Sequence, residues 1–161
     1  MSAKNQLLAQ YNLHNVLFNN VTVGISNEES EKVLLAPMNT VKWLAGHLVW
    51  GQGGLARMAG VKMDIAWLPL YDTQSRTPVP EGIETPTFEE IKAAWNQYAA
   101  EIETGLGNLP DEALNSPVQF ALPQFKTVEG LWAFINHHQA YTIGKIGILR
   151  RGLGKDAMKY M

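Results

Sequence analysis

The 161-residue chain contains no cysteine and has few charged residues. The absence of cysteine excludes disulfides, thiolate metal ligands and cysteine nucleophiles, and it leaves the redox environment open. Charged residues make up 17% of the chain, compared with about 25% in an average protein. The formal net charge is only −2, so there is no electrostatic basis for a nucleic-acid partner. The 46% of hydrophobic residues argues against disorder.

Long uninterrupted hydrophobic runs are also missing. The uncharged stretch over residues 5–27 is broken repeatedly by asparagine and glutamine, whereas a signal peptide or a membrane span needs a continuous apolar segment. We therefore expect no membrane partner and a cytoplasmic location. The length and composition favour a single domain over residues 1–161.

Four segments show apolar side chains at spacings of three and four residues, which is typical of amphipathic helices. The first two predicted helices run from Ala3 to about Gly24 and from about Thr40 to Ala59, where Gly60 follows. The third begins at Thr87 with the capping box Thr87–Glu90. The fourth runs from a Thr127 cap to about Arg151. No strand pattern competes, although residues 118–122 have room for a brief pairing.

Four helices of this length can bury their apolar stripes only against one another, which predicts an all-α four-helix bundle. The connection from Gly60 to Pro86 is too long for a tight turn, and its aromatic half, Trp67–Tyr71, is expected to pack. At about 3.3 Å per residue this connection can span the ~30 Å length of a 20-residue helix. The second and third helices can therefore run parallel, joined by a crossover, although the Asn108–Lys126 linker is also long enough for one.

Two of the four histidines lie within apolar stripes and are the first candidates for a site. His47 belongs to the second predicted helix and His138 to the fourth. An imidazole that faces a bundle interior must be hydrogen-bonded or bound to something, so each is either a satisfied core residue or a ligand. Gly51 and Gly54 lie within about 40° of the direction of His47. Because they remove side-chain volume, either a ligand pocket opens there or another helix packs closely.

The fourth predicted helix adds polar groups near His138. Thr142 and Lys145 follow it by one and two turns. A lysine on this face is unfavourable unless it snorkels to the bundle mouth or meets an anion. Trp43 and Tyr141, each within about one turn of a histidine, complete the ligand pocket that we expect.

Two motifs at these positions resemble those of the DinB/YfiT-like superfamily of bacterial four-helix bundles. The segment Asn39–Leu48 is similar to the family's N-S/T-x-x-W-L-x-G-H-L, and the segment His138–Arg151 is similar to H-E-x-Y-H-x-G-Q-I…L-R-R. The resemblance extends over nearly the whole chain. It implies an up-down-down-up bundle with the long crossover between the second and third helices.

The same resemblance implies a divalent metal, often nickel or zinc, held by three histidines. His47 matches the ligand of the second helix and His138 the first ligand of the fourth, but Thr142 stands at the third ligand position. A neutral hydroxyl is a weak donor to these metals. Gln139 replaces a common glutamate and Lys145 a common glutamine, so all three departures act against a bound dication.

Two further histidines are weaker candidates for completing such a site. His137 is turned about 100° from His138 on the helix and is expected to reach solvent or a neighbouring helix. His14, on the stripe of the first helix, reaches the site only if the helix registers agree.

The sequence leaves three functions open, and it leaves open whether the protein is an enzyme. The first is a degenerate family member that binds a small polar or anionic ligand, with weak or no metal binding. The second is a metal-dependent hydrolase or thiol-dependent transferase that uses His47 and His138. The third is a homodimeric interaction module that uses the aromatic crossover.

Overall fold

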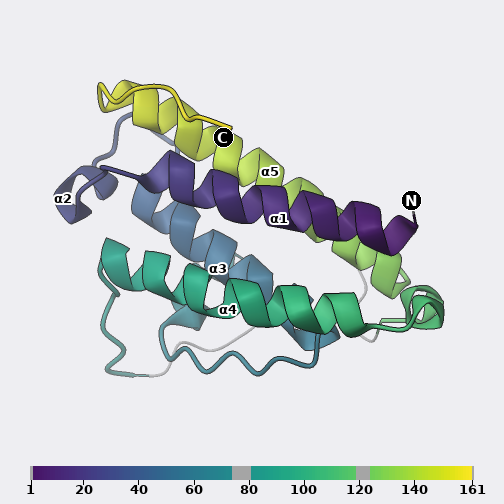
Figure 1. Ribbon diagram of the computed structural model, residues 1–161. Helices are drawn as coiled ribbons and strands as arrows, with labels where there is room; N and C mark the ends of the chain where they lie inside the picture. The colour runs from purple at the N-terminus through teal and green to yellow at the C-terminus, as the bar shows by residue number, and fades with distance from the viewer. Residues whose placement is uncertain (1, 74–80, 119–123, 161) are drawn as a thin grey trace.

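Four long helices pack side by side in the computed structural model, which describes residues 2–73, 81–118 and 124–160 (Figure 1). They are α1 (Ala3–Thr22), α3 (Val41–Met58), α4 (Phe88–Asn108) and α5 (Val128–Gly152). A single-turn helix, α2 (Asn27–Ser30), precedes α3, and two 3₁₀ turns, η1 (Leu68–Tyr71) and η2 (Asp111–Asn115), lie in the connections. The predicted all-α bundle is confirmed.

Threonine caps begin three of the long helices, and those at Thr87 and Thr127 are predicted by the sequence. The hydroxyls of Thr40 and Thr127 each accept a backbone N–H three residues later at 3.2 Å. At the start of α4, Thr87 and Glu90 form the full capping box. These caps satisfy backbone donors that the first helical turn leaves free. Gly60 follows α3 with a φ of +72°, a conformation that favours glycine.

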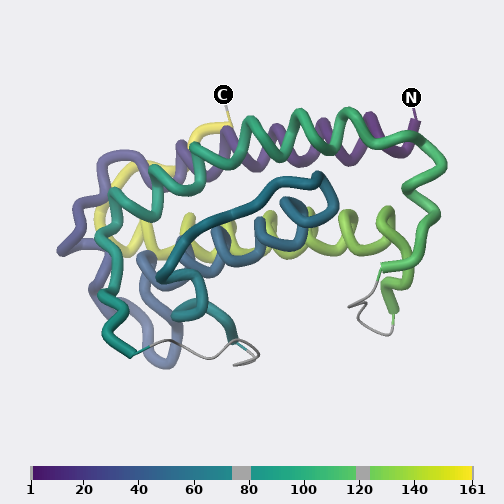
Figure 2. Tube along the Cα trace, turned by 90° about the horizontal axis from the view of Figure 1, so that it is seen from below, coloured from purple at the N-terminus to yellow at the C-terminus, as the bar shows by residue number. Residues whose placement is uncertain are grey.

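Contacts between the helices show their relative directions. Lys4 of α1 donates to the carbonyl of Leu109, just beyond α4, at 2.9 Å, and Asn19 donates to Asn96 at 2.9 Å. These two contacts make α1 antiparallel to α4. In Figure 1, α3 runs in the same direction as α4, and α5 runs with α1. The connection after α3 therefore has to return along the bundle before α4 begins, and Figure 2 shows its first part doing so.

The crossover covers the core instead of standing away from it. Tyr71 is buried, and Trp67, Leu68 and Leu70 are half-buried against the apolar cluster that includes the stacked pair Phe18–Trp95. The prediction that the aromatic half of this connection packs is confirmed. Each Å² of apolar surface that these side chains bury stabilises the fold by about 25 cal/mol.

Some sequence predictions fall outside the described ranges. Residues 119–123, which make up most of the segment with a predicted brief pairing, are not described; beside them, an isolated antiparallel bridge joins Pro117 and Thr127. Residues 74–80 of the crossover also lie outside. Within the described ranges, no helix combines the length and the apolar character that crossing a bilayer requires.

Candidate functional site

The two histidines that the sequence singles out meet inside the bundle. Nε2 of His47, on α3, lies 3.1 Å from Nε2 of His138, on α5. The rings are nearly perpendicular, at 81°, with centroids 4.9 Å apart. His47 is buried and His138 is half-buried. A distance of 3.1 Å is that of a hydrogen bond between the two rings, so one nitrogen donates and the other accepts.

The crossover determines which nitrogen of His47 carries the proton. Nδ1 of His47 lies 2.9 Å from the backbone oxygen of Tyr71. Because a carbonyl only accepts hydrogen bonds, Nδ1 must be the protonated nitrogen, and Nε2 of neutral His47 presents a lone pair. His138 then donates from Nε2, and its Nδ1 is an acceptor that makes no hydrogen bond to the described residues. A Cβ atom at Gly51 would lie 3.8 Å from this Nδ1, so the glycine leaves room beside it.

Burial keeps both imidazoles uncharged near neutral pH. It lowers the pKa of His138 to about 4, with further contributions from His47, Lys145 and His137. Burial also lowers the pKa of His47, partly opposed by its hydrogen bond to Tyr71 and by the negative charge of Asp72. The charge of Lys145 lowers the pKa of both histidines. The site therefore holds two neutral rings, with the positive charge of Lys145 acting on both and the negative charge of Asp72 acting on His47.

Aromatic rings fix the orientation of the pair. Trp43 and Trp50 stack on His47 with centroids 5.1 Å away in both cases, at interplanar angles of 17° and 13°. They precede and follow His47 by four and three residues on α3, which places them on the same side of the helix. Phe134 lies 6.4 Å from His138 in a stacked arrangement. The imidazole of His47 is therefore held by a hydrogen bond at one edge and stacking on its faces.

Tyr141 and Lys145 lie toward the surface of the bundle. Tyr141, which the sequence places in the expected ligand pocket, is 59% exposed. Three residues after His138, a helical side chain is turned by about 60° from it, and here that rotation leads to solvent. Nζ of Lys145 lies 4.2 Å from the centroid of the Tyr141 ring. This is the snorkelling arrangement, stabilised by a cation–π contact. Whether Tyr141 lines a ligand site stays a prediction.

Gly51 and Gly54, the two glycines near His47, differ in what lies next to them. At Gly54 a Cβ atom would lie 2.7 Å from Cδ1 of Ile135, so the close-packing alternative applies there. Gly51 faces His138 at an ordinary contact distance. Thr142 is buried, one turn after His138. The pair is therefore closed by helix packing on the Gly54 side.

The remaining histidines stand apart from the pair. His137 is exposed, as predicted. Nδ1 of His14 lies 3.2 Å from Oε1 of Gln139, and both residues are buried. Nearby, Nε2 of Gln52 lies 3.4 Å from the hydroxyl of Tyr11. This second polar group joins α1 to α3 and α5 through hydrogen bonds that sequence reasoning did not foresee.

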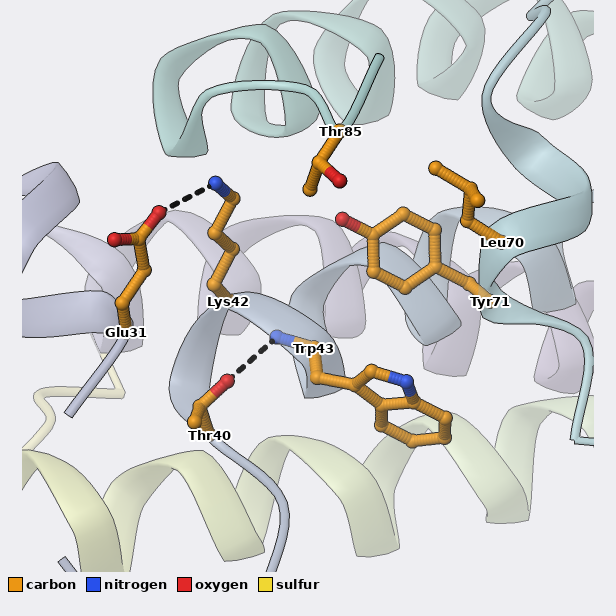
Figure 3. A pocket seen from close by; sticks show the side chains of 7 residues that line it. All are labelled: Glu31, Thr40, Lys42, Trp43, Leu70, Tyr71 and Thr85. Carbon is orange, nitrogen blue, oxygen red and sulfur yellow. Dashed lines mark hydrogen bonds and ion pairs between the residues drawn. The ribbon is translucent and has the colours of Figure 1, made fainter. Parts of the chain in front are cut away.

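A cavity of about 360 Å³ opens at the start of α3, beside the pair. It is lined by Glu31, Thr40, Lys42, Trp43, Leu70, Tyr71 and Thr85 (Figure 3). Of these residues, only Trp43 belongs to the predicted pocket. Thr40 and Lys42 adjoin Trp43 at the start of α3, and the other four come from other segments, which a single helical stripe does not reveal. One signal of this cavity was present in the sequence, the glycine at position 46 next to His47. The ring of Tyr71 occupies the space that a Cβ atom of residue 46 would fill.

The chain supplies two of the three metal-binding histidines that the resemblance to the DinB/YfiT-like superfamily implies. His47 and His138 are together, but Thr142 holds the third position. In the described part of the chain, no group of three or more histidine, aspartate or glutamate side chains is placed to share an ion. The residues present fit a two-histidine site that needs outside ligands, not a closed three-histidine centre.

Four long helices with an interior histidine pair from two facing helices define the class of protein: a helical bundle with a buried imidazole site. The family model of the DinB superfamily matches residues 9–144, which include both histidines. The chain belongs to this superfamily. No curated protein matches it.

Proposed function

We propose that this DinB-superfamily protein binds a small polar or anionic molecule at the His47–His138 pair. The observation that carries the proposal is the 3.1 Å contact between the two Nε2 atoms. Because the rings use these atoms on each other, the atom left for a ligand is Nδ1 of His138, beside Gly51. A hydroxyl or amide of the ligand can donate to this nitrogen.

The charge near His138 favours an anion over a cation. Lys145 lowers the pKa of both histidines, which means that its positive charge acts on the site. In the described ranges, no acidic residue is among the groups whose charge contributes to the lowered pKa of His138, whereas at His47 the negative charge of Asp72 opposes Lys145. A small anion beside His138 would be attracted by Lys145 and would favour a protonated Nδ1 that donates to it.

A thermal-shift series with inorganic phosphate and acetate tests this proposal. We expect each active anion to raise the melting temperature by mass action, with a larger rise at pH 5.5 than at pH 7.5, because the bound state favours protonated His138. Lys145→Gln should reduce the rise, whereas Lys62→Gln, at an exposed lysine before the crossover turn, should not. Equal responses of the two variants, or no response to either anion, would contradict the proposal.

A second candidate function is a metal-dependent hydrolase or thiol-dependent transferase. The hydrogen bond from Nδ1 of His47 to Tyr71 favours it, because it leaves Nε2 with a lone pair. Imidazoles that bind zinc or nickel commonly donate their other nitrogen to a carbonyl in this way. His47 and His138 would hold the ion, with its remaining ligands from outside the chain. When bound, the ion would supply Lewis-acid chemistry.

Acidification separates the two candidates. Metal affinity falls with pH because the histidines must be unprotonated to bind, whereas the affinity for an anion rises. Calorimetric titrations with NiCl₂, ZnCl₂ and sodium phosphate at pH 6.0 and 7.5 would measure both trends. Binding of nickel or zinc at pH 7.5 that disappears in His138→Gln, together with no phosphate response, would favour the metal-dependent function.

A homodimer stays a separate prediction. The crossover residues that the sequence leaves free either to cover the core or to form a dimer contact pack on the bundle's own core, with Tyr71 buried and Trp67 half-buried. Sedimentation velocity at several protein concentrations measures the stoichiometry. A monomer at the highest concentration would remove the dimer from consideration.

A further inference from the structure

The cavity at the start of α3 has one apolar wall and one hydrogen-bonding wall. Trp43, Leu70 and the ring of Tyr71 form the apolar wall. Lys42 and Thr85 bring polar groups to the opposite side (Figure 3). Its volume, about 360 Å³, lies within the range of pockets that hold small organic molecules.

The hydroxyl of Tyr71 is a donor that points into this cavity. Tyr71 is 3% exposed, and Figure 3 shows its hydroxyl directed toward Thr85 and the end of Lys42. This hydroxyl makes no hydrogen bond to the chain within residues 2–73, 81–118 and 124–160. Burial raises the pKa of Tyr71 to about 12, so the phenol keeps its proton. The hydroxyl is not among the fully buried polar atoms of the described residues that lack a partner, so it opens on the cavity, where an acceptor on a ligand can accept its hydrogen bond in place of water.

The charge in the cavity is already balanced. Nζ of Lys42 donates to Oε1 of Glu31 at 2.7 Å. The hydrogen bond to Lys42 and its charge lower the pKa of Glu31, so that carboxylate stays ionised. Among the described residues that line the cavity, no cation is left unpaired to compensate an added anion for the negative charge of Glu31. An uncharged acceptor meets no such penalty, and Lys42 still has two N–H groups to donate.

We infer that this cavity is a second binding site, separate from the histidine pair, for an uncharged small molecule with an apolar or aromatic body and a carbonyl oxygen. The body lies against Trp43 and Leu70. The carbonyl accepts a hydrogen bond from the hydroxyl of Tyr71, in reach of Thr85 and Lys42. This site does not depend on an anion or a metal at His138.

An occupant of the cavity would contact two of the residues that hold His47. Trp43 stacks on His47, and the backbone oxygen of Tyr71 accepts its Nδ1–H. The two sites therefore share a wall. Because Tyr71 uses its carbonyl for His47 and its hydroxyl for the cavity, a change confined to the hydroxyl probes the second site alone.

Three compounds of similar shape test the inference: acetophenone, benzoate and ethylbenzene. They present a neutral carbonyl, a carboxylate and no acceptor. Titrations followed by the indole N–H signal of Trp43 in ¹H–¹⁵N spectra would give each affinity. We expect acetophenone to bind more tightly than either of the others. Tighter binding of benzoate, or no shift of the Trp43 signal up to the solubility limit of acetophenone, would overturn the inference.

Tyr71→Phe removes only the hydroxyl and keeps both the ring and the backbone carbonyl. It should weaken acetophenone binding about three- to tenfold, the effect of one lost hydrogen bond, and leave ethylbenzene unchanged. Tyr160→Phe, at a 63% exposed position, is the matched control and should have no effect. If Tyr71→Phe folds poorly, Thr85→Val provides a second test at an exposed position.

Equal acetophenone affinity in wild type, Tyr71→Phe and Thr85→Val would refute the role of the hydroxyl wall. The phosphate response at pH 5.5, measured on the same samples, reports the histidine pair separately. If the cavity does not bind acetophenone, the thermal shift with phosphate can still be observed. If the histidine pair does not bind phosphate, acetophenone can still bind in the cavity.

Discussion

The ring of Tyr71 lies against the backbone of Gly46, in the space that a Cβ atom would fill. This contact lets the crossover approach α3 closely enough for the backbone oxygen of Tyr71 to reach His47, the next residue. The cavity and the histidine pair both depend on it. A glycine in a helix interior costs about 1 kcal/mol relative to alanine, and here that cost is offset by the packing of the aromatic ring.

Gly46→Ala should therefore displace Tyr71 and destabilise the fold. We expect a loss of about 1–3 kcal/mol, as for other overpacked positions, measured by urea denaturation. Gly53→Ala is the matched control on the same helix, because nothing lies within 4 Å of its Cβ position. It should stabilise the protein by up to about 1 kcal/mol. Equal effects of the two substitutions would show that the Tyr71 contact is unimportant.

Substitutions at His47 can distinguish the contribution of its hydrogen bond to Tyr71 from that of its hydrogen bond to His138. His47→Ala leaves the carbonyl of Tyr71 without a donor and should cost about 1–3 kcal/mol of unfolding free energy. That loss lowers the melting temperature by about 2–4 °C per kcal/mol for a chain of this size. His47→Asn keeps an N–H group near the position of Nδ1 and should retain more stability, although it removes the contact to His138. If both variants lose the same stability, the hydrogen bond to Tyr71 contributes little.

The stability of the fold should fall as the pH is lowered from about 6.5 toward 4. Burial, together with His47, Lys145 and His137, lowers the pKa of His138 from 6.5 to about 4. The unfolded chain therefore binds more protons than the folded one in this interval, so stability rises with pH there and is fully present above it. His47 and His14, whose pKa values are also lowered, act in the same direction.

Chemical denaturation at pH 7.5, 6.0 and 4.5 measures this slope. His138→Gln should flatten it, whereas His137→Gln, at the exposed neighbour, should preserve most of it. A wild-type slope that His138→Gln leaves unchanged would assign the acid sensitivity to other groups.

Thr142→His should create the third imidazole that the chain lacks. Because residues 138 and 142 lie one turn apart on α5, the new ring is on the same side as His138. We expect nickel or zinc to bind about tenfold more tightly or better, equivalent to about 1.4 kcal/mol or more, in calorimetry at pH 7.5. Thr142→Val keeps the size of threonine and controls for the loss of its hydroxyl. No gain over wild type would mean that position 142 does not face the pair.

The long helices could be predicted because their signals are local. Apolar spacing and the threonine caps act within a few residues, and the structure begins α3, α4 and α5 directly after Thr40, Thr87 and Thr127. The short helix α2 was missed, although Ser26 and Glu29 form a capping box of the same kind. One turn has no apolar stripe, so a search by periodicity passes over it.

The site was only partly predictable because helix rotation and long-range packing decide the rest. His47 and His138 each lie in a stripe, and their meeting follows from the bundle. The exposure of Tyr141 and the contact of Gly54 with Ile135 depend on how α5 is turned against α3. The spacing of apolar residues in the sequence predicts the rotation of a helix only to within the width of its apolar face. The cavity depends on a crossover whose path no periodicity specifies.

The spacing between the end of α3 and Tyr71 also has a chemical consequence. The segment after Met58 runs back along α3 and brings one particular backbone oxygen to the imidazole edge. Inserting or deleting a residue between Met58 and Tyr71 would place a backbone N–H or a displaced oxygen next to Nδ1 of His47 instead. The hydrogen bond that fixes the tautomer of His47 would then be lost. The protonation pattern of an interior ring is thus set by the length of a loop.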